Sequence, residues 1–196
     1  MEAEMLLFEA VRYYKFFNNS YHNYSHALDV LEAVEKMTDD ESVKLAAIWH
    51  DAVYIAGAKA GVNEEASSAA LTKTWSRIGV DGNIPILHKA TRLINQTTAT
   101  HFMTANLDQS DYELGILLDA DLTALSLPYN QFKKKQEDIQ IENGLENGTI
   151  VSNTRSANFL STFLHVRPRI YHFITGLEEA ARANIEQYVK EVYSKS

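Results

Sequence analysis

The feature that most limits how this chain can fold is the rarity of residues that break helices. Its 196 residues include 3 prolines and 8 glycines, and so few breaks favour long helices over many short strands. Apolar residues recur at helical spacing, as in Leu6, Leu7, Ala10, Val11 and Tyr14. No alternating strand pattern persists for more than a few residues. The sequence therefore predicts an all-α bundle of about eight or nine helices.

The expected helices follow from this periodicity and from the polar turns between apolar runs. They cover residues 6–14, 25–37, 43–49, 84–95, 112–125, 129–143, 156–164 and 177–193, and a further helix starts near Asn63. No internal repeat, low-complexity tract or linker divides the chain, and its length suits one domain. We therefore expect a single domain over residues 1–196.

Composition and charge exclude several classes of function. The chain has no cysteine, which excludes disulfides, iron–sulfur clusters, thiolate catalysis and cysteine-rich zinc sites. It has 18 Lys and Arg against 26 Asp and Glu, a net charge of -8. Such a chain without a basic run is unsuited to a nucleic-acid polymer, because neutralising phosphates supplies most of that affinity. A small phosphorylated substrate remains possible, because a metal ion can invert the local field.

The beginning of the sequence favours a cytoplasmic protein. Residues 1–5 are acidic and lack the basic start and apolar core of a signal peptide. No stretch approaches the ~20 apolar residues of a membrane span, so we expect no membrane partner. Tyr13, Tyr14, Phe16 and Phe17 form an aromatic cluster. We expect it in the core or at a contact between copies, which leaves a homo-oligomer possible.

Three segments carry groups that can do chemistry on this helical background. The first has His22 and His26 four residues apart, which puts both on one helix face unless His22 precedes the helix as part of its cap. The second is the pair His50 and Asp51 at the end of an apolar helix. The third places Asp119 and Asp121 within an apolar segment. A carboxylate there is costly unless it is paired or binds a cation, and this cost singles out both residues.

The donor types indicate a divalent metal. Helix positions two apart point about 200° away from each other, so only one of the two aspartates can face a given site. Imidazole and carboxylate without sulfur suit Mn, Fe, Ni, Zn or Mg, and such an ion activates water and polarises a phosphoryl oxygen. Each residue alone has an ordinary interpretation, a core histidine or a helix cap. A histidine, then a histidine–aspartate pair, then an aspartate, in this order along a helical chain, together favour a metal site.

The same order resembles the HD-domain superfamily of metal-dependent phosphohydrolases. More closely, the chain resembles small bacterial and phage proteins described as predicted metal-dependent HD phosphohydrolases. The shared stretches lie at residues 21–26, 49–54, 63–71, 118–122, 167–171 and 180–184. The resemblance covers about residues 12–190 and implies an HD-domain helical bundle.

This resemblance implies roles for individual residues. His26, His50, Asp51 and Asp121 would bind the metal. We favour Asp121 because Ala-Asp-Leu at 120–122 is similar to the Ala-Asp-x-Leu form in which many HD proteins present their last ligand. Asp119 remains a candidate for contact with the substrate, or for the ligand itself.

The segment at residues 21–26 also resembles class I cyclic nucleotide phosphodiesterases. Those enzymes share Tyr-His-Asn-x-x-His, and the match implies that His22 donates a proton to the leaving group, a role that suits imidazole near neutral pH. This chain is far shorter than those catalytic domains and lacks most of their pocket. A purely structural hydrogen bond is the alternative for His22.

The remaining polar candidates have weaker patterns. Glu64 and Glu65 could orient or deprotonate the attacking water, or could simply be carboxylates in the first turn of a helix. His101 lies where the resembled family also carries threonine and histidine, and could contact substrate or a second metal. Arg155 and Arg169 could hold phosphate oxygens in their guanidinium fork, or could pair with an acid.

The sequence leads us to expect a metal-dependent phosphohydrolase that cleaves a phosphate ester of a nucleotide. The bond could belong to a monoester or a diester, including a cyclic nucleotide or an alarmone. One alternative is a di-iron HD oxygenase, with His88 and His101 as extra ligands. Another is a non-catalytic, metal-binding HD scaffold, although no core ligand is missing.

Overall fold

The computed structural model describes residues 2–80, 83–98, 111–144 and 150–194. Within these ranges it contains nine α-helices, two short 3₁₀ helices and no strand, which confirms the predicted all-α fold. The elements are α1 (Glu2–Phe17), α2 (Tyr24–Glu35), α3 (Glu41–Trp49), α4 (Val62–Ile78), α5 (Ile84–Asn95), α7 (Tyr112–Asp121), η2 (Leu122–Ser126), α8 (Tyr129–Glu142), α9 (Ile150–Val166), η3 (Thr175–Leu177) and α10 (Glu178–Tyr193). None of the described helices is both long and apolar enough to cross a bilayer.

The structure breaks one predicted helix in two. The segment expected to be helical over 112–125 ends as an α-helix at Asp121 and continues as the 3₁₀ helix η2. Two side-chain hydroxyl groups donate hydrogen bonds to backbone carbonyls of this turn. Thr123 Oγ1 donates to Ala120 O at 2.7 Å, and Ser126 Oγ donates to Thr123 O at 2.8 Å. Such side-chain bonds compete with regular helical pairing. Asp121 therefore lies at the very end of α7.

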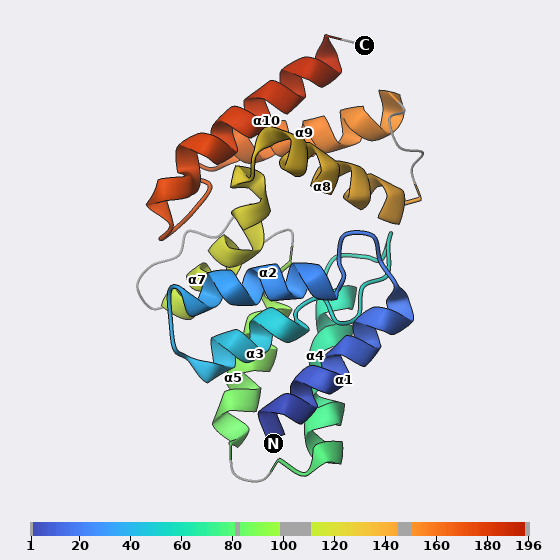
Figure 1. The fold of residues 1–196 in the computed structure, drawn as a ribbon, viewed down its shortest axis with the longest axis vertical. Coiled ribbons are helices and arrows are strands. Elements are labelled where there is room, and N and C mark those ends of the chain that lie inside the picture. Colours follow the sequence, from blue (N-terminus) through green and yellow to red (C-terminus); the bar gives the residue numbers. More distant parts are fainter. Residues whose placement is uncertain (1, 81–82, 99–110, 145–149, 195–196) are drawn as a thin grey trace.

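The described helices build two hydrophobic cores, joined by α7 and η2 (Figure 1). The first core is formed by α1 to α5 with α7, and the second by η2 with α8, α9 and α10. Trp49 and Leu117 are fully buried in the first core, and Phe132 and Phe163 are buried in the second. At this junction Asp121 lies beside His26 and His50 of the first group of helices, whereas Leu122 and Leu125 pack in the second core.

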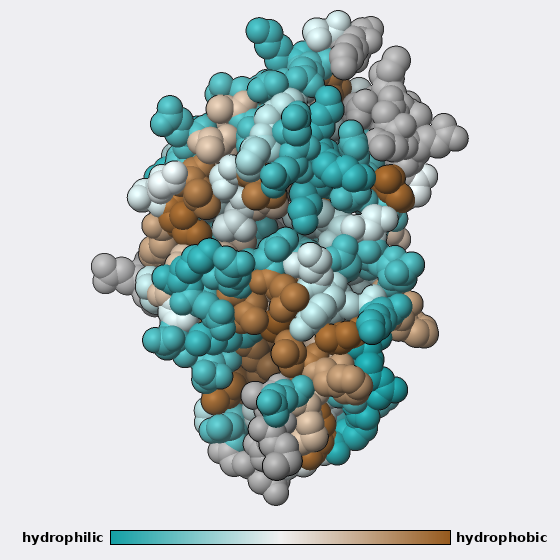
Figure 2. All heavy atoms as spheres, in the orientation of Figure 1, coloured by the Kyte–Doolittle hydropathy of each residue, from teal (hydrophilic) through white to brown (hydrophobic). Residues whose placement is uncertain are grey.

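The aromatic cluster at residues 13–17 divides between core and surface. Tyr14 is buried and its hydroxyl donates to Ile48 O at 3.0 Å. Tyr13 packs edge-on against Trp49, with ring centroids 5.6 Å apart. Phe16 is 82% exposed, and Figure 2 shows further apolar surface over α2 and α3. A homo-oligomer through such surfaces stays a prediction.

A polar network joins three helices of the first core. Asp40 caps α3, and its Oδ1 accepts from Ser42 N at 2.8 Å. Its second oxygen accepts from Lys89 Nζ of α5 at 2.8 Å, and the same ammonium reaches Glu113 of α7 at 2.7 Å. Burial raises the pKa of Asp40, but the bonds from Lys89 and Ser42 outweigh it, so that pKa lies below its usual value. The bond from Lys89 also lowers the pKa of Glu113.

We predict that Lys89→Met lowers the free energy of unfolding by about 1 kcal/mol at pH 7, because water screens a half-exposed network. Carboxyl groups whose pKa is depressed by folding stabilise above their unfolded pKa of about 4, and this contribution disappears as pH falls through the folded pKa. The difference between variant and wild type should therefore shrink as the pH falls below about 4. Urea unfolding at several pH values measures it.

Lys36→Met provides the matched control, because Lys36 pairs with Glu32 within one helix and both side chains are about 70% exposed. We expect no measurable loss of stability from this variant at any pH. An unchanged difference for Lys89→Met between pH 7 and pH 3 would contradict the account of the network.

Candidate metal centre

The first histidine pair is positioned by the start of α2. Asn23 caps this helix, and its Oδ1 accepts from Ser25 N at 2.9 Å and from His26 N at 3.2 Å. His22 therefore precedes the helix, and His26 lies in its first turn with only 3% of its surface exposed. The four-residue spacing thus brings the two rings together around a helix N-terminus, with centroids 5.9 Å apart.

The end of α3 directs His50 inward. His50 is the C-cap residue, is 1% exposed, and its Nδ1 lies 2.9 Å from Ala47 O. A ring nitrogen can bond a carbonyl only by donating a proton. The neutral ring therefore carries its proton on Nδ1 and leaves the lone pair of Nε2 for the site, a tautomer suited to metal binding.

Two histidines and two aspartates meet where α2, α3 and α7 converge. His26 Nε2 lies 2.9 Å from Asp121 Oδ1, and His50 Nε2 lies 2.9 Å from Asp51 Oδ2. The crossed distances are 3.6 Å from His26 Nε2 to Asp51 Oδ2 and 3.7 Å from His50 Nε2 to Asp121 Oδ1. We call these four residues the His/Asp cluster.

The cluster has the properties of a cation site. Although carboxylate oxygens lie close to them, Nε2 of His26 and Nε2 of His50 are buried and make no hydrogen bond with any described residue. An unsatisfied buried polar atom is costly unless something else occupies its lone pair. Ligand atoms of His26, His50 and Asp51 lie within 4.8 Å of one another. These three residues could hold a metal ion, and nitrogen with oxygen donors suits a divalent one.

The charges of the cluster balance one another strongly. Burial lowers the pKa of both His26 and His50, but the adjacent carboxylates of Asp51 and Asp121 outweigh it and raise both pKa values. Burial alone would raise the pKa of Asp51 and of Asp121, and the imidazoles hold both well below the usual value. The carboxylates therefore stay ionised, as metal ligands must be.

The two aspartates of α7 point to different parts of the molecule. Asp119 is completely buried and accepts from three backbone N–H groups, His172 N at 2.7 Å, Phe173 N at 2.6 Å and Ile174 N at 3.0 Å. It does not line the cavity described below. The structure thus places Asp119 under the segment before α10, away from its expected place beside a substrate, and Asp121 at the histidines.

His22 is held by a residue that the sequence did not single out. Glu142, at the end of α8, accepts from Tyr21 N at 3.0 Å and from His22 N at 2.9 Å, and its carboxylate also contacts His22 Nδ1. The ring of Tyr54 stacks on His22 with centroids 3.6 Å apart and planes 13° apart. An acid in the last turn of a helix is unfavourable next to the helix dipole, which was the one sequence signal that Glu142 has a partner elsewhere.

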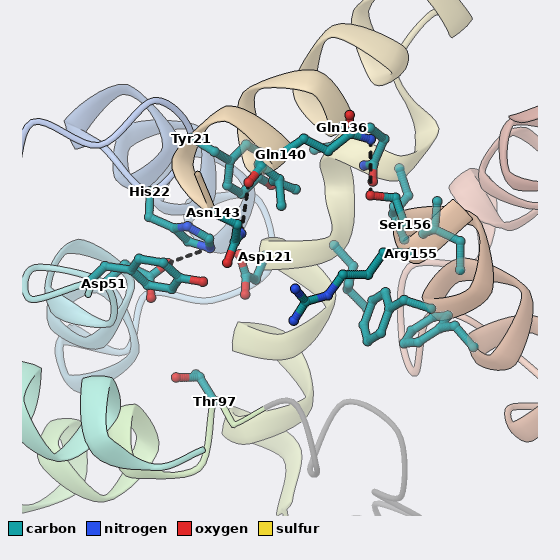
Figure 3. Close-up of a pocket in the computed structure, with 18 of the residues that line it drawn as sticks. Tyr21, His22, Asp51, Thr97, Asp121, Gln136, Gln140, Asn143, Arg155 and Ser156 are labelled. Atoms are coloured by element: carbon teal, nitrogen blue, oxygen red, sulfur yellow. Dashed lines mark hydrogen bonds and ion pairs between the residues drawn. The ribbon is translucent and has the colours of Figure 1, made fainter. Parts of the chain in front are cut away.

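A cavity of about 400 Å³ opens beside the cluster, between the two cores. Asp51 and Asp121 line its acidic end, and Phe159 and Phe163 belong to its apolar wall on α9. Figure 3 shows Arg155 reaching from α9 toward Asp121. Gln136, Gln140, Asn143 and Ser156 complete the polar lining from α8 and α9. The cavity therefore offers charged groups at one end and an aromatic surface at the other.

The structure brings some of the weaker candidates to this cavity and leaves others outside. Glu64 is half-buried and lines it, and burial together with the charge of Asp51 raises the pKa of Glu64. Arg155 lines it as well. Glu65 and Arg169 are exposed and do not line it.

The histidines considered for a second metal gain no support. His88 is exposed on α5 and does not line the cavity, and His101 lies outside the described residues.

The buried Arg167, two residues before Arg169 in sequence, packs over Phe163, and its Nη2 lies 2.6 Å from His172 Nε2. It therefore belongs to the second core.

No family model matches the chain, and no curated protein matches it.

The two aspartates of α7 give a matched pair of variants. We predict that Asp121→Asn weakens Mn²⁺ binding at least ~10²-fold, because a neutral amide replaces an ionised ligand. Asp119→Asn should leave Mn²⁺ affinity within about twofold and instead lower the free energy of unfolding by about 2 kcal/mol or more, because it removes a charged acceptor from buried N–H groups. Calorimetric titration and urea unfolding measure the two effects. Loss of metal affinity in Asp119→Asn alone would assign the roles the other way round.

Proposed function

We propose that this protein is a metal-dependent phosphohydrolase that cleaves a phosphate ester bond of a nucleotide. The observation that carries the proposal is that the buried Nε2 atoms of His26 and His50 make no hydrogen bond within the described residues and lie beside two carboxylates at the end of an open cavity. Such a constellation suits a hydrolytic divalent metal, and the cavity gives a substrate access to it.

His26, His50, Asp51 and Asp121 would hold the ion, and a bound divalent ion supplies an acidified water and a polarised phosphoryl oxygen. In the reaction the water oxygen forms a bond to phosphorus, and the bond from phosphorus to the ester oxygen breaks. One water is consumed, and the products are an alcohol and a phosphate. The protein must therefore accept a proton on one side of phosphorus and return one on the other.

Glu64 is the residue we assign to the proton of the attacking water. It is half-buried, lines the cavity and lies within electrostatic range of Asp51. Its raised pKa makes its carboxylate a stronger base than an exposed glutamate, as general base catalysis requires. Glu65 is exposed on the next helical position and has no part in this assignment.

His22 is the residue we assign to the leaving oxygen. Its Nε2 lies 4.0 Å from Asp51 Oδ2 and therefore at the metal end of the cavity. Glu142 contacts its Nδ1 and binds its backbone N–H, which fixes the direction of the ring. A positioned imidazole can give its proton to the departing alkoxide.

The opposite wall of the cavity supports a phosphorylated substrate with an apolar or aromatic part. Arg155 reaches into the space between α9 and the cluster, and no acid among the described residues pairs with it. A guanidinium fork that pairs with no described acid suits phosphate oxygens. The resemblance to HD phosphohydrolases makes a nucleotide our choice, in which the base would lie toward Phe159.

Turnover of a nucleotide panel tests this proposal. Mono-, di- and triphosphates, cyclic nucleotides and alarmones are incubated with Mn²⁺ and the protein, and phosphate and nucleoside release are measured. We predict that Asp51→Asn lowers turnover of the preferred substrate at least ~10³-fold, because losing a ligand removes the activated water.

Asp39→Asn is the matched control, since the Asp39 side chain is fully exposed and does not line the cavity. Its turnover should stay within about twofold of wild type. Equal turnover by wild type and Asp51→Asn would reveal a contaminating enzyme. Metal binding without turnover of any substrate would favour the scaffold or the oxygenase over the hydrolase.

A further inference from the structure

Three side chains from two other parts of the chain, the α1–α2 loop and helix α4, hold the segment around Tyr54 in place. The carbonyl of Tyr54 accepts from Asn19 Nδ2 at 3.0 Å. The residue before it exchanges two hydrogen bonds with Ser67 Oγ, at 3.1 and 3.2 Å. The residue after it exchanges two with the amide of Asn63, at 3.0 and 3.3 Å. A loop fixed at three successive residues holds its central side chain with little freedom.

The ring of Tyr54 has a defined place at the acidic end of the cavity. It stacks on His22, with planes 13° apart, and it lines the cavity. Its hydroxyl makes no hydrogen bond with any described residue, although Asp51, Glu142, Glu64 and Asp121 all lie within electrostatic range of it. Three of these carboxylates belong to the cluster or to the cavity lining, so the hydroxyl lies near the reacting groups.

The electrostatic surroundings keep this hydroxyl protonated. Burial and then the negative charge of Asp51 raise the pKa of Tyr54 far above its usual value. The group is therefore a neutral O–H donor near neutral pH. A hydroxyl of a cavity-lining residue that bonds to no described residue is available to a ligand in that cavity.

A phosphoryl group at the cluster needs such a donor. Its oxygens carry negative charge that increases as water attacks, and donors aimed at that charge lower the barrier. The acidic end of the cavity is otherwise lined mainly by carboxylates, whereas the hydroxyl of Thr97 is used by Ile94 O at 2.8 Å. A neutral phenol beside His22 can approach the anion from the protein side.

We propose that Tyr54 is a further catalytic residue, whose hydroxyl donates a hydrogen bond to a non-bridging oxygen of the substrate phosphoryl group. This inference rests on the proposed function, since it requires a phosphoryl group at the His/Asp cluster. It adds an anion-binding donor that neither the metal ligands nor the proton-transfer residues provide.

The substitution Tyr54→Phe tests the inference, because it removes only the phenolic oxygen and retains a ring that can stack on His22. Inorganic phosphate, the product shared by phosphomonoesters, is titrated into the Mn²⁺-loaded protein in a calorimeter. We expect the dissociation constant for phosphate to rise about tenfold or more, the usual effect of losing a hydrogen bond to a charged group. Mn²⁺ affinity should stay within about twofold of wild type, because no metal ligand changes.

Tyr13→Phe is the matched control. Tyr13 is half-buried, packs on Trp49 and does not line the cavity, so phosphate and Mn²⁺ binding should equal those of wild type. With the substrate found in the nucleotide panel, Tyr54→Phe should lower kcat more than it raises KM, because the phosphoryl charge grows toward the transition state.

The outcomes separate this inference from the proposed function. Wild-type phosphate affinity and kcat in Tyr54→Phe would overturn the role of Tyr54 and leave the hydrolase standing. An equal loss of Mn²⁺ affinity and phosphate affinity would also overturn it, because the residue would then support the cluster only structurally. A wild-type protein that binds Mn²⁺ but neither binds phosphate nor hydrolyses any ester would refute both.

Discussion

The balance of charge between two buried imidazoles and two carboxylates constrains the rest of this structure. His26 and His50 are 3% and 1% exposed, and each has a carboxylate oxygen 2.9 Å from its Nε2. An unpaired charge in such a place would cost several kcal/mol. Because the four groups come from α2, α3 and α7, those helices must meet at this point for the charges to compensate. A cation that replaces the imidazole protons satisfies the same balance.

Carboxylates also hold the irregular segments around the site. Asp119 binds the N–H groups of residues 172–174, Glu142 those of 21 and 22, and Glu178 those of 170 and 171. Backbone groups outside helices need partners when they are buried, and ionised acceptors are the stronger ones. Two of these links join different cores, since Asp119 lies on α7 and Glu142 on α8. The walls of the cavity are thereby fixed relative to the cluster.

The helices could be predicted because each one carries its own apolar period, although the caps Asn23 and Asp40 start two of them one or two residues earlier than expected. The His/Asp cluster could be predicted as a set because charged residues in apolar segments need a reason. Asp119 shows where that argument ends. It satisfied the same rule as Asp121, and only the packing of the segment before α10 shows that backbone N–H groups are its partners.

Glu142 and Tyr54 could not be found from the sequence for a related reason. Both act across long separations, Glu142 on a loop about 120 residues earlier and Tyr54 on His22. A glutamate at a helix end and a tyrosine in a loop are common in any helical protein. Their value depends on which segments the two cores bring together, and local periodicity carries no information about that. Arg155 was a candidate from the sequence, but its place opposite the cluster follows from the position of α9.

The most direct test of the account is an anomalous difference map from crystals grown with Mn²⁺ and recorded near the manganese absorption edge. The account predicts a peak at bonding distance, about 2.1 Å, from Nε2 of His26 and of His50 and from carboxylate oxygens of Asp51 and Asp121. A map with full occupancy of Mn²⁺ at another place, or with no peak between these four residues, would contradict it.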